Sequence, residues 1–182
     1  MIDFYGSADK GLAPLILTAR FEAEAQGYFD RLRKAYFPPA RNMIPAHLTL
    51  FHALPGAQRA EIEDELAERC WQAEPFMAQA SGLRFTGNGV AIVVEAPALV
   101  ALQVGIASSW REVLIPQDRQ RFSPHVTVQN KVTPAHARQT FDALQSVFVP
   151  FDFEIEGLDL WHYRGGPWEA AGSFPFGGMP VA

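Results

Sequence analysis

Cysteine is nearly absent from this sequence: Cys70 is the only one among 182 residues. No internal disulfide can form, and nothing in the cysteine usage predicts an oxidising compartment. The pattern Ile62, Leu66, Cys70 follows helical spacing in the helix predicted for residues 57–73, with Trp71 beside it. We therefore expect Cys70 to be a packed, inert thiol and not a nucleophile.

Long apolar runs are also absent. No stretch approaches the roughly 18 residues that a membrane-spanning helix needs. The N-terminus carries Asp3 and Asp9 ahead of a short apolar segment and lacks the basic start of a secretory signal. These absences predict a cytoplasmic protein with no membrane partner.

Positive charge is scarce: 15 Lys and Arg residues face 20 Asp and Glu residues, for a net charge of −5. Affinity for long duplex nucleic acid comes chiefly from many Lys and Arg contacts to phosphates, so such a partner is not expected. A small or terminal phosphate remains possible. The sequence also lacks G-x-S-x-G, H-E-x-x-H, a cysteine pair and an Asp-rich loop, which disfavours a serine hydrolase and a dedicated metal site.

The chain does have enough apolar residues for a core, at 48% hydrophobic and 12% aromatic, and its length suits a single domain. Helical periodicity alternates with β-type runs. Strands are expected near 15–18, 46–54, 76–96 (with a turn at 87–89), 125–132 and 151–156, and helices near 22–37, 57–73, 97–115 and 134–148. A final hairpin is expected from 158–164, through a turn at 165–167, to residue 168 and beyond. This order predicts an α+β fold.

A His-x-Thr-x pattern occurs twice, at His47-Leu48-Thr49-Leu50 and at His125-Val126-Thr127-Val128. The aliphatic residues favour β-strands, in which successive side chains point to opposite faces. Each histidine should share a face with the threonine two residues on, while the aliphatic residues enter the core. Each segment thus offers one imidazole and one hydroxyl, which suits an enzyme that handles a phosphate.

The surroundings of the two motifs repeat as well. Proline precedes each histidine, and Pro55 and Pro134 follow the motifs, each ahead of a helical pattern. Copies spaced 78 residues apart indicate an approximate internal repeat. We expect residues 1–182 to form one bilobal domain with repeat halves 12–96 and 97–182.

The duplicated motif resembles that of the two-histidine phosphoesterases, the superfamily of 2′-5′ RNA ligases and cyclic phosphodiesterases, whose signature is a repeated His-x-Thr/Ser-x with a hydrophobic last position. The strand-proline-helix order extends the resemblance over most of the chain. It implies two pseudo-symmetric lobes, each an antiparallel sheet backed by helices, with the motif strands facing each other across a central cleft. Hydrolysis in this family implies a 2′-phosphate product. Val128 departs from the leucine that is common at that position.

Two histidines can supply the chemistry that opening a cyclic phosphodiester requires. With a reference pKa of about 6.5, one imidazole can be neutral and accept a proton from water while the other is charged and protonates the leaving oxygen. Thr49 and Thr127 could donate hydrogen bonds to the phosphate oxygens. Which histidine, His47 or His125, has which role cannot be read from a near-symmetric motif.

Other residues are weaker candidates for the rim of the cleft. Strand alternation places Phe51 on the face of His47, and Gln129 and Lys131 on the face of His125, while Arg41 and Arg121 lie in the loops before the motifs. Packing or solvent exposure is the competing interpretation for each. The same alternation places His52 behind the sheet or at its end.

The sequence therefore predicts a cofactor-free, metal-independent phosphoesterase acting on a 2′,3′-cyclic phosphate, or a related 2′-5′ linkage, at an RNA end or in a small nucleotide. The alternatives are a reversible 2′-5′ RNA ligase and a non-catalytic nucleotide-binding or phosphate-binding module. Two histidines that are only hydrogen-bonded core residues, or that bind a metal with a third ligand, also remain open. The oligomeric state is not determined by the sequence, and a monomer is expected.

Overall fold

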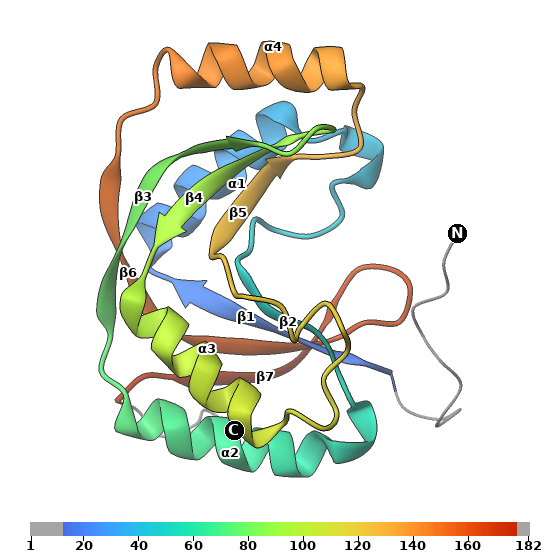
Figure 1. The fold of residues 1–182 in the computed structure, drawn as a ribbon, viewed down its shortest axis with the longest axis vertical. Helices are drawn as coiled ribbons and strands as arrows, with labels where there is room; N and C mark the ends of the chain where they lie inside the picture. The colour runs from blue at the N-terminus through green and yellow to red at the C-terminus, as the bar shows by residue number, and fades with distance from the viewer. Residues whose placement is uncertain (1–12, 178–182) are drawn as a thin grey trace.

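The computed structural model describes residues 13–177 (Figure 1). Its strands are β1 (Leu15–Phe21), β2 (Thr49–Leu54), β3 (Phe76–Phe85), β4 (Val90–Glu95), β5 (His125–Gln129), β6 (Phe151–His162) and β7 (Glu169–Pro175). Its helices are α1 (Ala23–Tyr36), α2 (Arg59–Gln72), α3 (Pro97–Ser109) and α4 (Pro134–Gln145).

All seven strands form one antiparallel sheet with the order β2-β1-β6-β3-β4-β5, and β7 also pairs with β6. The motif strands β2 and β5 are therefore the two ends of the sheet. Figure 1 shows the sheet curling, so that these two strands approach each other in the middle of the molecule. The curl brings together motifs that are separated by most of the sheet's width.

Strand β6 joins the two parts of this sheet. Its first residues, Phe151 to Ile155, pair with β3, and residues Gly157 to His162 pair with β7, while β1 runs along the other edge. At Gly157 an added Cβ would lie 2.5 Å from the carbonyl oxygen of Phe174, so only glycine allows β7 to approach this closely. The strand expected at 151–156 and the hairpin arm expected at 158–164 are thus one continuous strand that ends at His162.

The helices cover the sheet on both parts. α1 packs against β5, α2 against β6 and β7, and α4 against β3 and β4. α3 and α4 each begin with a proline, which fits the first turn of a helix because its missing N–H would have no partner there. Phe21, Phe29 and Phe153 meet edge to face under α1 and build a dense aromatic core.

The prediction of an α+β fold is confirmed. The sheets of the two lobes are joined into one, because the 12 residues of β6 are enough to pair with both. The element order β1-α1-β2-α2-β3 recurs as β4-α3-β5-α4-β6. The halves 12–96 and 97–182 stay a prediction, and residues 12 and 178–182 lie outside the described part. So do Asp3 and Asp9, on which the expectation of a cytoplasmic protein partly rests. Between residues 13 and 177 no helix is both long and apolar enough to cross a membrane.

Candidate active site

His47 lies just before β2, in a segment that is fixed from both sides. The backbone N–H of Ala19 in β1 donates to the carbonyl oxygen of Leu48 at 2.9 Å. From α1, the Asp30 carboxylate accepts the N–H of Ala46 at 2.7 Å, and the Gln26 amide donates to the carbonyl oxygen of Ala46 at 2.9 Å. The backbone that carries His47 is therefore held without being a regular strand.

His125 opens β5 and is fixed in a related way. The N–H of Val94 in β4 donates to the carbonyl oxygen of Pro124 at 3.1 Å, and His125 pairs with Val93. The side chains of His125 and Thr127 are half-buried, while Val126 and Val128 between and after them are fully buried. The predicted alternation of this motif is therefore observed.

The two imidazoles have matching hydrogen bonds. Nδ1 of His47 lies 2.8 Å from the carbonyl oxygen of Pro45, and Nδ1 of His125 lies 2.8 Å from that of Ser123. A carbonyl oxygen only accepts, so each Nδ1 carries the hydrogen and each neutral ring keeps Nε2 as its acceptor. Both rings thus present the same nitrogen for chemistry.

Burial lowers the pKa of both histidines. For His47 desolvation dominates and, with positive charge from Arg33, His52 and His125, outweighs the Pro45 hydrogen bond and lowers the pKa to about 4. The pKa of His125 is lowered by desolvation first and then by positive charge on Arg84 and His52. Because a charge on His125 affects His47, the two rings lie within electrostatic reach of each other. A surrounding positive field of this kind favours an anionic ligand.

Thr49 and Thr127 occupy equivalent places on their strands. Thr49 pairs with Thr18 of β1, and Thr127 pairs with Ala91 of β4. Both threonine side chains are half-buried, as are the histidines two residues before them. In both motifs the histidine and the threonine are half-buried and the residue between them is buried, the pattern expected when the two side chains share one face.

Directly after each threonine the register shifts by one residue. Two residues of β2, Leu50 and Phe51, face one residue of β1, and two residues of β5, Val128 and Gln129, face one residue of β4. All four are buried. An irregularity of this kind reverses the alternation of faces beyond it.

The reversal overturns two predicted rim residues. Phe51 is 0% exposed and packs against Trp110, with ring centroids 5.9 Å apart. Gln129 is also 0% exposed, and its amide donates to the hydroxyl of Thr140 in α4 at 2.8 Å. Fully buried side chains cannot form a substrate rim, so both placements are wrong.

The same reversal brings His52 to the side of the motif histidines. His52 is exposed, and its charge lowers the pKa of both His47 and His125, so it lies near both. Its Nδ1 lies 2.8 Å from the Asp118 carboxylate, which also accepts the N–H groups of His52 and Ala53 at 2.9 and 3.1 Å. Strict alternation placed His52 behind the sheet or at its end, and it did not predict this proximity to the motif histidines because it took no account of the shift in register.

Trp168 is a further neighbour that the sequence did not indicate. Its ring centroid lies 4.6 Å from that of His47 at an angle of 51°, and 6.3 Å from that of Trp161. It precedes β7, in the loop that follows β6. No motif marks this residue, because the contact depends on how the β6–β7 loop returns over β2.

The remaining predicted residues are exposed. Arg41 ends a short 3₁₀ turn, Pro39–Arg41, and Lys131 lies in a turn beyond β5 with a φ of 62°. Arg121 lies in the segment before β5 and borders a cavity beside α3. Cys70 is buried, and burial raises its pKa to about 12, as expected for an inert thiol. Within the described residues no group of three or more His, Cys, Asp and Glu side chains is arranged to hold a metal ion.

Solved structures with a similar fold share little sequence identity with this chain. TT0787 of Thermus thermophilus superimposes with a TM-score of 0.67 and 18% identity, over 91% of this chain and 98% of that one. A structure described as a phosphoesterase superimposes with a TM-score of 0.58 and 19% identity, over 91% of this chain and 99% of that one. E. coli LigT complexed with 3′-AMP superimposes with a TM-score of 0.57 and 16% identity, over 91% of this chain and 99% of that one. These likenesses support the fold.

A search of curated proteins finds no match to the chain. The sequence profile described as the 2′-5′ RNA ligase superfamily matches residues 21–167, a span that includes both motifs and the turn before Trp168. The resemblance noted from the two motifs is therefore confirmed, and the chain belongs to the 2′-5′ RNA ligase superfamily.

Proposed function

We propose that this protein is a metal-independent phosphoesterase that opens a 2′,3′-cyclic phosphate, or cleaves a related 2′-5′ phosphodiester, at an RNA end or in a small nucleotide. The observation that carries this proposal is the matched pair of imidazoles. Each donates Nδ1–H to the carbonyl oxygen two residues before it and keeps Nε2 available. Positive charge on His125 also lowers the pKa of His47.

In the proposed reaction one histidine takes a proton from water, and the water oxygen forms a bond to phosphorus. The bond from phosphorus to one ribose oxygen breaks, and the other histidine gives that oxygen a proton. Thr49 and Thr127 donate hydrogen bonds to the non-bridging oxygens, where negative charge accumulates. One water is consumed, the ring opens, and by family likeness the phosphate stays on the 2′ oxygen.

The charge state of the site agrees with this scheme. Burial keeps the pKa of both histidines low, so both rings are neutral in the unliganded protein at pH 7. An incoming phosphate monoanion favours the charged form of a nearby imidazole and so raises its pKa. The anion itself thereby helps to create the acid that its leaving oxygen needs.

The test is turnover of 2′,3′-cyclic nucleotides in the presence of EDTA. The wild type should produce the nucleoside monophosphate, and His47→Ala and His125→Ala should each lose activity by a factor of about 10² to 10⁴. His136→Ala is the matched control, because His136 is exposed in the first turn of α4. Full activity in either motif variant, or dependence of the wild type on an added metal, would refute the proposal.

Two alternatives are separated by the same preparation. Ligation of RNA ends through a 2′-5′ bond would identify the reverse reaction, for which the histidines would exchange roles. Binding of cyclic nucleotides without any product would identify a non-catalytic module. Small nucleotides are suitable probes because LigT has been crystallised with 3′-AMP, ATP and NADP⁺.

A further inference from the structure

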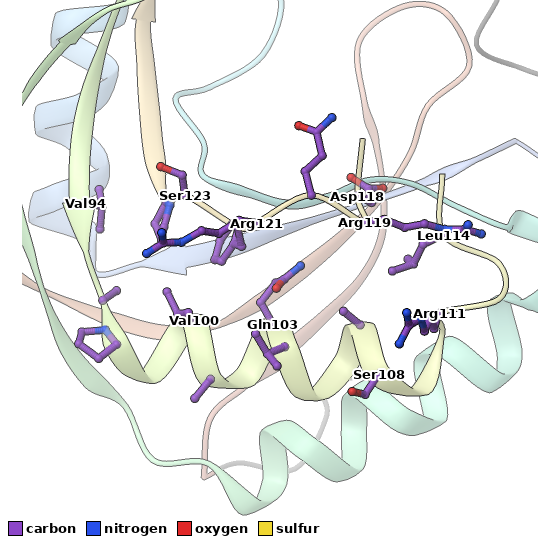
Figure 2. Close-up of a pocket in the computed structure, with 18 of the residues that line it drawn as sticks. Val94, Val100, Gln103, Ser108, Arg111, Leu114, Asp118, Arg119, Arg121 and Ser123 are labelled. Carbon is purple, nitrogen blue, oxygen red and sulfur yellow. The ribbon is translucent and has the colours of Figure 1, made fainter. Parts of the chain in front are cut away.

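A cavity of about 1130 Å³ lies between α3 and the segment from residue 114 to residue 124, which leads into β5 (Figure 2). Val100 and Gln103 line it from the helix, and Arg121 and Ser123 line it from the segment. None of the residues proposed for catalysis lines this cavity. It is larger than the roughly 300–1,000 Å³ typical of small-molecule sites, so it has room for a nucleotide.

Gln103 is the polar group at the base of this cavity. Gln103 is only 4% exposed. Within residues 13–177 its side-chain amide has no hydrogen-bond partner. Figure 2 shows the amide rising from α3 towards the opposite segment. The amide is open to the cavity, so a ligand with a matching donor and acceptor would be able to bind it at two points. The edge of a nucleobase is such a ligand, because side-chain amides pair with base edges in two-point contacts.

Unpaired positive charge surrounds the same cavity. Within the described residues, Arg111 and Arg121 have no hydrogen-bond or ion-pair partner, and Arg119 donates only to the carbonyl oxygen of Glu112 at 3.4 Å. Of the two acidic residues in the wall, Asp118 is already occupied by His52 and Ala53, and Glu95 lies at the β4 end. Free guanidinium groups beside a base-sized cavity favour a phosphate on the same ligand.

The cavity wall is continuous with the candidate active site. The carbonyl oxygen of Ser123 accepts the hydrogen bond from Nδ1 of His125, and Asp118 orients His52. Two residues of extended chain, about 7 Å, separate Ser123 from His125. The lining of the cavity therefore comes within two residues of His125, so a ligand in it would be a neighbour of a phosphate held at the histidines.

We propose that this cavity binds the nucleotide that precedes the cyclic-phosphate nucleotide in an RNA chain, with Gln103 contacting its base and Arg121 contacting the phosphate that joins the two nucleotides. An oligonucleotide end is then preferred as substrate over a free nucleotide. This inference rests on the phosphoesterase activity proposed above for its kinetic test, and a binding test separates it from that activity.

The kinetic test compares 2′,3′-cyclic AMP with the dinucleotide CpA that ends in a 2′,3′-cyclic phosphate. The wild type should show a kcat/KM at least tenfold higher for the dinucleotide. Gln103→Leu and Arg121→Gln should each lower kcat/KM for the dinucleotide about 5- to 20-fold, as expected for the loss of one hydrogen bond or ion pair. Both variants should leave turnover of 2′,3′-cyclic AMP unchanged. Arg31→Gln, an equal charge change on the exposed side of α1, should leave both substrates unaffected.

Equal kcat/KM values for the two substrates in the wild type, or an equal loss on both in the variants, would overturn the subsite while the phosphoesterase proposal stands. If neither substrate is turned over, the activity proposal fails, and binding decides the subsite. CpA with a 3′-phosphate should then bind more tightly than 3′-AMP to the wild type and not to the variants; equal affinities would refute the subsite. Arg121→Gln alters an exposed residue, so it decides alone if Gln103→Leu does not fold.

Discussion

The guanidinium of Arg33 in α1 donates a 2.9 Å hydrogen bond to the carbonyl oxygen of Thr127 in β5. Its Nε also donates to the carbonyl oxygen of Ile44 at 3.2 Å and to the side chain of Asn42 at 2.9 Å, ahead of His47. Arg33 is 5% exposed, and its guanidinium lies 4.0 Å from the ring centroid of Phe37. One buried cation therefore ties the segments of both motif histidines to the same helix.

Replacing Arg33 should destabilise the protein and disturb both motifs. Arg33→Met keeps much of the volume but removes the donor from two partly buried carbonyl oxygens, those of Ile44 and Thr127, which should lower the free energy of unfolding by about 2–4 kcal/mol. The free energy of unfolding of Arg33→Lys should lie between those of the wild type and Arg33→Met, because an ammonium group cannot reproduce the planar set of donors of a guanidinium. Urea unfolding measures both, with Arg31→Gln as the exposed control. A change below about 0.5 kcal/mol in Arg33→Met would contradict the role given to this side chain.

His52 should influence the titration of both motif histidines. Positive charge on His52 disfavours a second charge nearby, and this contributes to the low pKa of His47 and of His125. The uncharged variant His52→Gln should therefore raise the pKa of both, most clearly for the ring that lies nearer. NMR titration of the imidazole carbon-bound protons measures the shift, and His136→Ala should leave it unchanged. A fall in either pKa would show that the charge of His52 is not what these rings sense.

The pH profile of the proposed activity should lie on the acid side. The value of kcat/KM reports the unliganded protein, in which one histidine must be charged and the other neutral. Both pKa values are lowered from 6.5, so the population with one proton peaks below pH 6.5. The optimum of kcat should lie higher, since a bound phosphate raises the pKa of a neighbouring imidazole. An optimum of kcat/KM above about pH 7 would mean that these rings are not the groups that titrate.

Stability should also depend on pH through His47. Its pKa is about 4 in the folded protein and about 6.5 in the unfolded chain, so the unfolded chain binds more protons between these values. This contribution is fully present above about pH 6.5 and is lost as the pH falls towards about 4, on the order of 3 kcal/mol. His47→Asn should reduce the loss measured by urea unfolding at about pH 7 and about pH 4.5. If the variant loses as much unfolding free energy as the wild type between these two pH values, the loss comes from groups other than His47.

The strand alternation that correctly placed His125 and Thr127 failed four residues beyond each motif histidine. Alternation depends on an uninterrupted ladder, and a single extra residue reverses it. The sequence around Leu50-Phe51 and Val128-Gln129 contains no glycine or proline to mark such a point. The motif, the α+β class and most elements were therefore predictable from local pattern. His52, Arg33 and Trp168 were not, because their places depend on register and on contacts between distant segments.

The correction for Gln129 can be tested directly. Its Oε1 is buried without a partner, while Nε2 donates to Thr140, so the pair is only partly satisfied. Gln129→Leu alone leaves the Thr140 hydroxyl unpaired and should cost about 1 kcal/mol. The double variant Gln129→Leu with Thr140→Val removes both polar groups from this buried site and should be at least as stable as the wild type. Thermal unfolding measures the two, with Thr140→Val alone completing the cycle. KM for a cyclic nucleotide should not change in the double variant, and a rise of tenfold or more would return Gln129 to the substrate rim.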